Sequence, residues 1–377
     1  MTVHDKKSRR NVLKAAGVAG VVGLAGCLGD DDDDDDDGDD AAPDDGDDAD
    51  DGDDADDAPE DVTFTIAGTA SGSSTQAAGQ AMALGASDHS DFLTIDVQES
   101  GGWTANLYDY DAGEFETIGV DINSWAQALA EDGPFADDPI DSWPLQGMVF
   151  TSLEMHWVAM DGSGIESTAD LREGGYTVYP IEPGFGTRLL TETLMQEDGM
   201  WDNLDINNED TDDIPGAVEE GRVDALAMYG SNGLELAGWC QEVDVRSGGS
   251  LYAIESDDQW VSTIQDYPGA AHRFGEIYGY EQDVTSELGI EEVDMWTLPG
   301  LWAFHPDKPA HGVYEFLRLA HEHHDTLRGS DPSTPDFGDL EVMTNGLLED
   351  VGIHPGAAEF FRDHDVWDDD TMTEGEI

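Results

Sequence analysis

Three stretches of the chain share one order of hydrophobic and polar positions. Val62–Ala67 alternates apolar and polar residues, which predicts a strand, and Leu93–Gln98 and residues 115–120 are predicted to be the next two strands. Each run is followed by a loop rich in Gly, Ser or Asn and then by a segment with helical periodicity. Three such units predict an open α/β sheet with a ligand crevice at the carboxyl ends of its strands.

Longer apolar runs follow. Residues 145–150 and 154–160 predict two β segments with no helix between them, typical of a chain that crosses between lobes, and residues 295–304 predict the return crossing. Further strands are predicted over 223–229 and 251–254. Further helices are predicted over 76–85, 167–173, 187–197, 214–221, 233–243, 259–267, 310–327, 340–348 and 355–363.

The segment 178–190 combines the features of a binding loop. It predicts a strand ending at Pro180, a glycine loop and a helix that begins at Thr187. The free N–H groups and positive dipole end of a helix favour an anion, and the fork of donors on Arg188 matches a carboxylate. The alternative is an ordinary strand–helix turn with a solvated Arg188.

The globular part of the chain is long enough for two lobes, because about 320 residues exceed one typical hydrophobic core. The predicted crossings divide it into lobe I, residues 61–150 and 298–377, and lobe II, residues 151–297. The expected ligand cleft lies between these two α/β lobes.

The N-terminal residues predict an export signal and a spacer. Arg9 and Arg10 form a twin-arginine motif, and the short apolar run after them ends in Leu-Ala-Gly-Cys, with Cys27 as the expected lipidation site. Residues 1–29 are therefore predicted to be a lipoprotein signal. Residues 30–60, largely Asp, Gly and Ala, predict a disordered acidic tether.

Charge describes the setting more than the function. The chain has 14 Lys and Arg against 87 Asp and Glu, a formal net charge of −73, and Lys308 is the only lysine after residue 57. A surface so acidic resembles that of proteins from salt-in halophilic archaea, where salt screens the self-repulsion. Nucleic acid is a poor partner for such a surface.

The order of motifs resembles the TAXI-type solute receptors of tripartite ATP-independent (TRAP) transporters. The resemblance begins after Val62 and covers most of the chain. It is carried by Gly79-Gln80-Ala81-Met82-Ala83, Ser100-Gly101-Gly102 with Asn106, Asp111-Ala112-Gly113-Glu114, Gly164-Ile165 with Ala169-Asp170-Leu171, Pro183-Gly184-Phe185-Gly186-Thr187-Arg188, Glu219-Glu220-Gly221-Arg222-Val223-Asp224-Ala225, and Ile353-His354-Pro355-Gly356-Ala357.

This resemblance implies a type II periplasmic-binding-protein fold that closes over a small organic acid or amino acid, such as glutamate, and delivers it to a membrane permease. We expect no cofactor and no metal site. The expected ligand-binding residues are Ser71, Gly72, Ser73, Trp103, Asn106, Asp121, Gly186, Thr187, Arg188, Tyr229 and Gly230.

The chain also departs from the family pattern. Trp103 and Phe185 stand where serine is common, which favours a more aromatic cleft and a ligand whose second half is less polar. Two alternatives remain at this point: a cell-surface α/β hydrolase and a non-transport surface lipoprotein. The sequence shows no nucleophile elbow and no Cys/His metal set, so we expect no enzyme. The expected location is the outer face of the cytoplasmic membrane, reached by the twin-arginine route.

Overall fold

The computed structural model describes residues 59–69, 73–183, 185–349 and 351–376. The described residues belong to one compact unit, residues 57–377. The predicted export signal with Arg9 and Arg10, the lipidation site Cys27 and most of the acidic tether lie outside the described residues. Two expected ligand-binding residues, Ser71 and Gly72, do so as well.

The unit that contains the described residues is built on a single mixed sheet. Its main path runs β2-β1-β3-β11-β4-β7-β5-β6, with β10 beside β11, β9 beside β4 and β8 beside β7. The strands are β1 (Val62–Ala67), β2 (Leu93–Gln98), β3 (Thr117–Asp121), β4 (Leu145–Met160), β5 (Thr177–Tyr179), β6 (Asp205–Ile206), β7 (Ala225–Ser231), β8 (Glu235–Leu236), β9 (Leu251–Ala253), β10 (Ala271–Glu276) and β11 (Glu292–Phe304).

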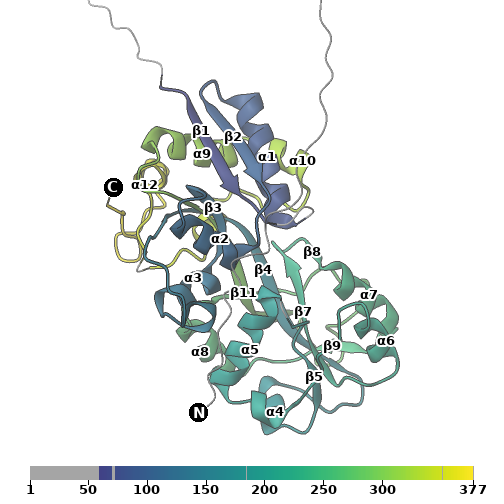
Figure 1. The fold of residues 1–377 in the computed structure, drawn as a ribbon. Helices are drawn as coiled ribbons and strands as arrows, with labels where there is room; N and C mark the ends of the chain where they lie inside the picture. Colours follow the sequence, from purple (N-terminus) through teal and green to yellow (C-terminus); the bar gives the residue numbers. More distant parts are fainter. Residues whose placement is uncertain (1–58, 70–72, 184, 350, 377) are drawn as a thin grey trace, which may run out of the picture. The chain divides into compact units, whose positions relative to one another are not determined.

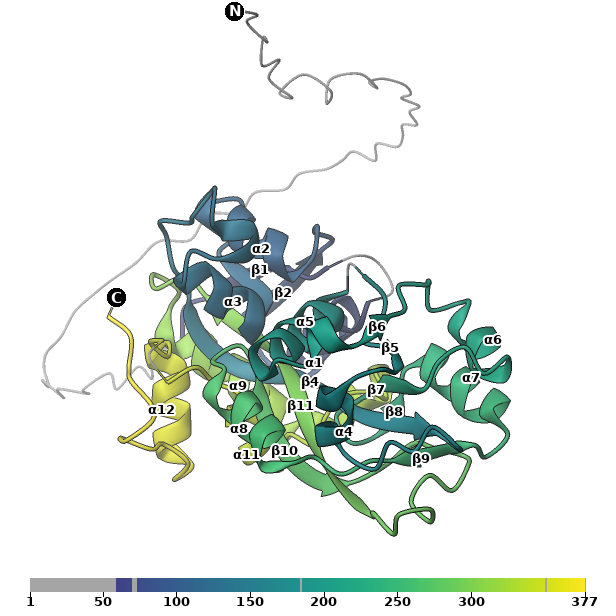
Figure 2. The same ribbon diagram turned by 90° about the horizontal axis from the view of Figure 1, so that it is seen from below.

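Helices pack around this sheet (Figure 2). The α-helices in the described residues are α1 (Ser74–His89), α2 (Trp103–Asp111), α3 (Ile122–Leu129), α4 (Thr168–Glu173), α5 (Gly186–Asp198), α6 (Ile214–Glu219), α7 (Gly238–Ser247), α8 (Asp258–Asp266), α9 (Ala310–Glu322), α10 (His324–Ser330), α11 (Glu341–Thr344) and α12 (Pro355–Asp363). Two short 3₁₀ helices, Gly133–Phe135 and Trp201–Asn203, follow α3 and α5.

The prediction of an α/β fold with two lobes is confirmed (Figure 1). In the first lobe β1 pairs in parallel with β2 and β3, and α1–α3 and α9–α12 surround them. In the second lobe β5 pairs in parallel with β6 and β7, accompanied by α4–α8. Parallel strands of one sheet require crossover connections, which is why α1 and α2 follow β1 and β2.

Two long antiparallel strands run through both lobes. β4 has 16 residues and β11 has 13, and they pair from Leu145 opposite Phe304 to Met155 opposite Trp296. The predicted crossings at 145–160 and 295–304 correspond to these strands. The lobe boundaries expected at residues 150/151 and 297/298 fall inside β4 and β11 and stay a prediction.

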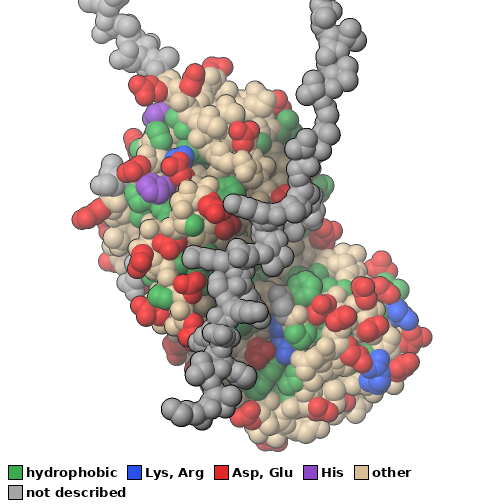
Figure 3. Space-filling view, in the orientation of Figure 1, with side chains coloured by type: hydrophobic (Ala, Val, Ile, Leu, Met, Phe, Trp, Pro, Cys, Tyr) green, Lys and Arg blue, Asp and Glu red, His purple; other side chains and the backbone are tan. Residues whose placement is uncertain are grey.

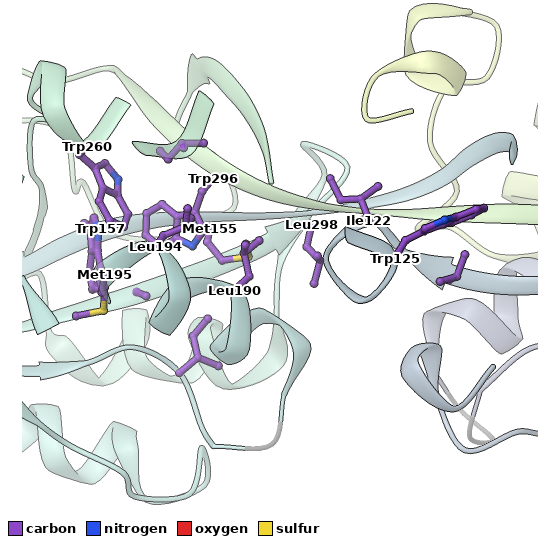
Figure 4. Packing of buried hydrophobic residues seen from close by; sticks show 14 of the residues in the cluster. Ile122, Trp125, Met155, Trp157, Leu190, Leu194, Met195, Trp260, Trp296 and Leu298 are labelled. Atoms are coloured by element: carbon purple, nitrogen blue, oxygen red, sulfur yellow. The ribbon is translucent and has the colours of Figure 1, made fainter. Parts of the chain in front are cut away.

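A continuous core follows the crossing strands. Figure 4 shows its side chains in a row, from Ile122 and Trp125 of α3 to Trp260 of α8. Trp296 lies at the centre of an aromatic cluster, with ring centroids 5.2 Å from Trp157 and 5.3 Å from Trp260. All four tryptophans are buried, so the strands that join the lobes are also where apolar burial is dense.

Three predicted helices differ from the structure. Residues 235–236 form strand β8 instead of helix, because Asn232 and Gly233 adopt positive φ angles (56° and 68°) and turn the chain into a hairpin. The predicted helix 310–327 is interrupted at His323, whose ring stacks on His89. The predicted helix 340–348 is only Glu341–Thr344.

Candidate ligand-binding site

Three helices point their N-termini at one cavity. α2 and α3 belong to the first lobe and α5 to the second, and the cavity has a volume of about 440 Å³. This volume lies within the roughly 300–1,000 Å³ typical of small-molecule sites. It is lined by Gly101, Gly102, Trp103, Thr104, Ala105, Asp121, Asn123, Ser124, Pro183, Phe185, Gly186, Arg188, Leu189 and Glu192.

Two of these helix N-termini have no side-chain cap. α2 begins after Gly102, whose φ of 114° is a conformation that glycine tolerates, and α5 begins after Phe185. Among the described residues, no side chain accepts a hydrogen bond from the first-turn N–H groups of either helix. These donors and the positive ends of the two helix dipoles therefore remain available to a ligand at the cavity.

α3 differs from these two helices because Asp121 caps it. Asp121 ends the fully buried strand β3, and its Oδ1 accepts a hydrogen bond from the Ser124 N–H at 2.8 Å. The residue is 3% exposed, lines the cavity and belongs to no ion pair within the described part of the chain. Burial raises the pKa of the Asp121 carboxyl, against the lowering effect of its hydrogen bonds.

Trp103 closes one side of the cavity. Its Nε1 donates to Thr75 Oγ1 at 2.9 Å, which joins the start of α2 to α1. A Cβ atom added at Gly300 of β11 would lie 3.2 Å from the Trp103 ring, so the crossing strand approaches the indole closely. The ring is therefore fixed between the two elements.

Arg188 lies in the cavity wall, with its donors engaged by the protein. Nη1 donates to Ile181 O (2.8 Å), Nη2 to Asn208 Oδ1 (2.9 Å) and Nε to Glu192 Oε2 (3.1 Å). The guanidinium also lies 5.2 Å from the centroid of the Trp201 ring. Arg188 thus holds the loop before α5, whose residue Ile181 has a φ of 76°. Its expected role as an anion anchor stays a prediction.

The remaining predicted residues of α5 start the helix itself. Gly186 lines the cavity, and Thr187 is buried beside it at 3% exposure. The Thr187 Oγ1 has no hydrogen-bond partner among the described residues. Its backbone oxygen accepts from Thr191 Oγ1 at 2.8 Å.

Ser73 and Asn106 serve the framework around the site. The Ser73 Oγ caps α1 by accepting from Gln76 N–H at 3.2 Å. Asn106 is fully buried, and its Nδ2 donates to Gly68 O (2.8 Å) and Gly119 O (2.7 Å), so it ties the end of β1 to β3. Neither residue lines the cavity, and a contact with ligand stays a prediction for both.

Tyr229 and Gly230 lie away from this cavity, at the end of β7. The Tyr229 ring packs against Trp239, with centroids 6.0 Å apart. Gly230 lies against Tyr278, where an added Cβ would meet the hydroxyl at 2.7 Å. These two residues are therefore not among those that line the cavity with Trp103, Asp121 and α5, and their contact with ligand stays a prediction.

Several cavity residues were not expected from the sequence. They include Thr104, Asn123, Ser124, Leu189 and Glu192. The spacing of α5 contained part of the signal, because positions 185 and 189, like 188 and 192, are four residues apart and share a face. Histidines at 321–324 form no metal site: no group of three metal-ligating side chains occurs in the described residues.

Two α/β lobes joined by crossing strands, with helix N-termini from both lobes around one cavity, define the class of type II solute-binding proteins. The chain belongs to the NMT1-like family, whose model matches residues 66–364. Members are extracytoplasmic solute-binding proteins of the ABC and TRAP transporter class, and they are transport proteins rather than enzymes. The protein is therefore a solute-binding receptor of this class.

Known structures with a similar chain path include three bacterial proteins. The periplasmic sulfonate-binding protein SsuA from Methylobacillus flagellatus KT is 11% identical, with 85% of this chain and 99% of that chain covered and a TM-score of 0.45. A TctC solute-binding protein from Polaromonas is 14% identical (74% and 88% covered, TM-score 0.44). An ABC transporter protein from Clostridium perfringens is 10% identical (80% and 97% covered, TM-score 0.43). No curated protein matches the sequence.

No helix among the described residues is both long and apolar enough to cross a membrane.

Proposed function

We propose that this protein is a TAXI-type receptor that captures a small organic acid or amino acid and delivers it to a TRAP-type membrane permease. The TAXI subtype is supported by the order of sequence motifs, among them Ser100-Gly101-Gly102 and Pro183-Gly184-Phe185-Gly186-Thr187-Arg188. Capture occurs by closure of the two lobes about β4 and β11, which are the strands common to both.

The observation that carries this proposal is the pair of uncapped helix N-termini. α2 comes from the first lobe and α5 from the second, and both line the same cavity. A carboxylate placed between them receives N–H donors from both lobes and therefore favours the closed arrangement. Arg188 also lines the cavity beside the α5 N-terminus, where its charge is paired with that of Glu192.

The N-terminal motifs support the proposed location. Arg9 and Arg10 would direct export by the twin-arginine route, and Cys27 would bear a lipid that anchors the protein at the outer face of the cytoplasmic membrane. The acidic residues 30–60 would then act as a tether between the lipid and the receptor, at a distance from the surface that their length sets.

Thermal unfolding tests the receptor function. The purified protein in molar KCl is heated with and without a panel of amino acids and organic acids. A compound present at a hundred times its Kd stabilises the folded state by about 2.7 kcal/mol, which gives a readable rise in Tm. We expect at least one carboxylate to produce this rise. If none does, the proposal fails.

A negative charge placed in the cavity tests where the ligand binds, and the same charge placed outside the cavity is the matched control. Ala105 lies in the first turn of α2 and lines the cavity, so Ala105→Glu puts a carboxylate where the ligand anion is expected, at a position that suits an acidic residue in a helix. We expect Ala105→Glu to remove the ligand-induced shift. Ser87→Glu adds the same charge at an exposed position of α1 and should leave the shift intact.

A further inference from the structure

The charges around the cavity do not balance. Its charged lining residues are Asp121, Arg188 and Glu192. Arg188 and Glu192 form an ion pair at 3.1 Å, so these two charges largely cancel. Asp121 is only 3% exposed, and it forms no ion pair with any of the described residues. The Asp121 carboxylate is therefore held by hydrogen bonds at the α3 N-terminus, with no cationic side chain paired to it among the described residues.

The cavity also has an apolar wall. Phe185 and Leu189 both line it and are each 40% exposed. They are four residues apart at the start of α5 and share one face. Trp103, fixed by its hydrogen bond to Thr75, faces the same cavity from the first lobe.

The uncapped N-termini of α2 and α5 provide the opposite pole. Their first-turn N–H groups suit an anion, whereas the N-terminus of α3 is already occupied by the Asp121 carboxylate. The cavity thus holds an anion-binding pole, a cation-binding pole and an apolar wall. These three features of the cavity are complementary to a zwitterion with an apolar side chain.

We propose that the ligand is an α-amino acid with an apolar side chain, whose ammonium group binds Asp121. Its carboxylate lies between the N-termini of α2 and α5, and its side chain packs on Trp103, Phe185 and Leu189. This assignment rests on the receptor function proposed above and narrows its ligand. A second carboxylate, as in glutamate, would lie near Asp121 and Glu192, which repel it.

Burial of Asp121 agrees with this assignment. Burial raises the pKa of the Asp121 carboxyl because the ionised form is poorly solvated. A ligand ammonium within a few ångströms favours the ionised form and replaces the solvation that the carboxylate lost. An anionic ligand without a cation leaves the Asp121 carboxylate without an ionic partner and brings its own negative charge into the same cavity.

Four related probes separate the contributions in isothermal titration calorimetry on the full chain in molar KCl. L-Leucine carries all three groups, 4-methylpentanoate lacks the ammonium, 3-methylbutylamine lacks the carboxylate, and L-glutamate replaces the apolar side chain by a carboxylate. We expect leucine to bind at least tenfold more tightly than each of the other three. Equal or tighter binding of 4-methylpentanoate or glutamate would overturn the inference and leave the receptor function standing.

A substitution at Asp121 tests the ammonium contact directly. Asn is as good a helix cap as Asp, so Asp121→Asn keeps the α3 N-terminus and removes only the charge. We expect it to weaken leucine binding at least tenfold without weakening 4-methylpentanoate. Asp132→Asn, the same change at an exposed cap, should leave both affinities unchanged. An unchanged leucine affinity in the Asp121→Asn variant would contradict the proposed ammonium contact. No binding by any amino acid or organic acid would overturn the receptor function itself.

Discussion

His156 lies buried in the middle of β4, where only a neutral imidazole is readily accommodated. Its Nε2 is 2.6 Å from the Tyr280 hydroxyl, and its Nδ1 has no hydrogen-bond partner among the described residues. Burial lowers the pKa of His156 to about 4, from an ordinary value near 6.5. The unfolded chain therefore binds a proton at this residue before the folded protein does.

This difference predicts a loss of stability in acid. The contribution of His156 is fully present above about pH 6.5 and is lost as the pH falls toward 4, because protons then favour the unfolded state. At pH 5 the loss is on the order of 1–2 kcal/mol. His156→Gln, which keeps an amide near the Tyr280 hydroxyl, should reduce the difference in urea-unfolding free energy between pH 7 and pH 5.

The exposed His311 provides the comparison for that experiment. His311→Gln changes a histidine on the surface of α9 and should preserve the wild-type difference between the two pH values. If both variants behave alike, burial of His156 is not the cause of the acid sensitivity.

Only some of the cavity residues and their contacts could be predicted from the sequence. Gly186, Arg188, Trp103 and Asp121 could be placed at the cavity because each follows a predicted strand and opens a predicted helix. The engagement of Arg188 could not be predicted, since its partner Asn208 and the Trp201 ring come from segments whose paths no local periodicity describes. For the same reason, the sequence could not show that Tyr229 lies outside the cavity lining.

At the scale of elements, Arg172 joins three helices of the second lobe. It lies in α4 and makes paired hydrogen bonds to Asp198 at the end of α5 (2.8 and 2.7 Å) and to Asp257, the N-cap of α8 (2.7 and 3.0 Å). These bonds hold the pKa of the Asp257 carboxyl down to about 2. The Arg172 side chain is only 20% exposed, so solvent screens its ion pairs only in part.

Lysine cannot reproduce this arrangement, because an ammonium lacks the planar fork that reaches two carboxylates. We expect Arg172→Lys to lower the free energy of unfolding by roughly 1–3 kcal/mol in urea titrations. Arg222 also contacts two carboxylates, Glu209 and Glu220, but is 42% exposed. Arg222→Lys should therefore change stability by less than about 0.5 kcal/mol. Equal losses in the free energy of unfolding of the two variants would show that the bonds of Arg172 to α5 and α8 stabilise the protein no more than an exposed ion pair does.

Gly356 fixes how closely α12 approaches α9. A Cβ atom there would lie 2.1 Å from the Ala310 carbonyl oxygen, a backbone atom that can move only with its helix. We expect Gly356→Ala to destabilise the protein by roughly 1–3 kcal/mol, measured as a lower urea midpoint. Gly216 of α6 has no atom within 4 Å of the corresponding position, so Gly216→Ala should be neutral or stabilising by up to about 1 kcal/mol.

Elements were predictable from the sequence where both ends carry clear signals, whatever their length. β1, β2 and α12 were predicted with the bounds that the structure shows, because each has a clear period and clear end signals. β10 was missed because it is half exposed and mixes charged and apolar residues. The helix expected at 340–348 ends early because Gly346, at a φ of 107°, approaches Pro299 of β11, a contact that only the tertiary fold creates.

At the scale of the molecule, the two lobes are joined by more than the crossing strands. Tyr267, which follows α8, donates to Asn123 Oδ1 at 2.7 Å, and Asn232 of the β7–β8 hairpin donates to Ser333 O at 2.8 Å. Asn123 also lines the ligand cavity. A ligand that closes the lobes must therefore keep or exchange these contacts, which connects cavity chemistry to the arrangement of the lobes.

Net charge acts on the whole folded unit. Acidic side chains are spread over the visible surface of both lobes and basic ones are few (Figure 3), in keeping with 87 Asp and Glu against 14 Lys and Arg. Mutual repulsion of these charges is greater in the compact state than in the unfolded chain. Salt shortens its range, from a Debye length of about 10 Å at 0.1 M to about 3 Å at 1 M.

We therefore expect the free energy of unfolding in urea to rise steadily as KCl increases from 0.1 M to 2 M near neutral pH. Preferential exclusion of salt from the surface would produce a rise as well, so the pH must separate the two causes. Near the sequence pI of about 4.1 the net charge is close to zero, and repulsion no longer opposes folding. The dependence on KCl should then flatten, even though protonation of His156 lowers the stability itself. A salt dependence that is equally steep at both pH values would assign the effect to exclusion and not to the acidic surface.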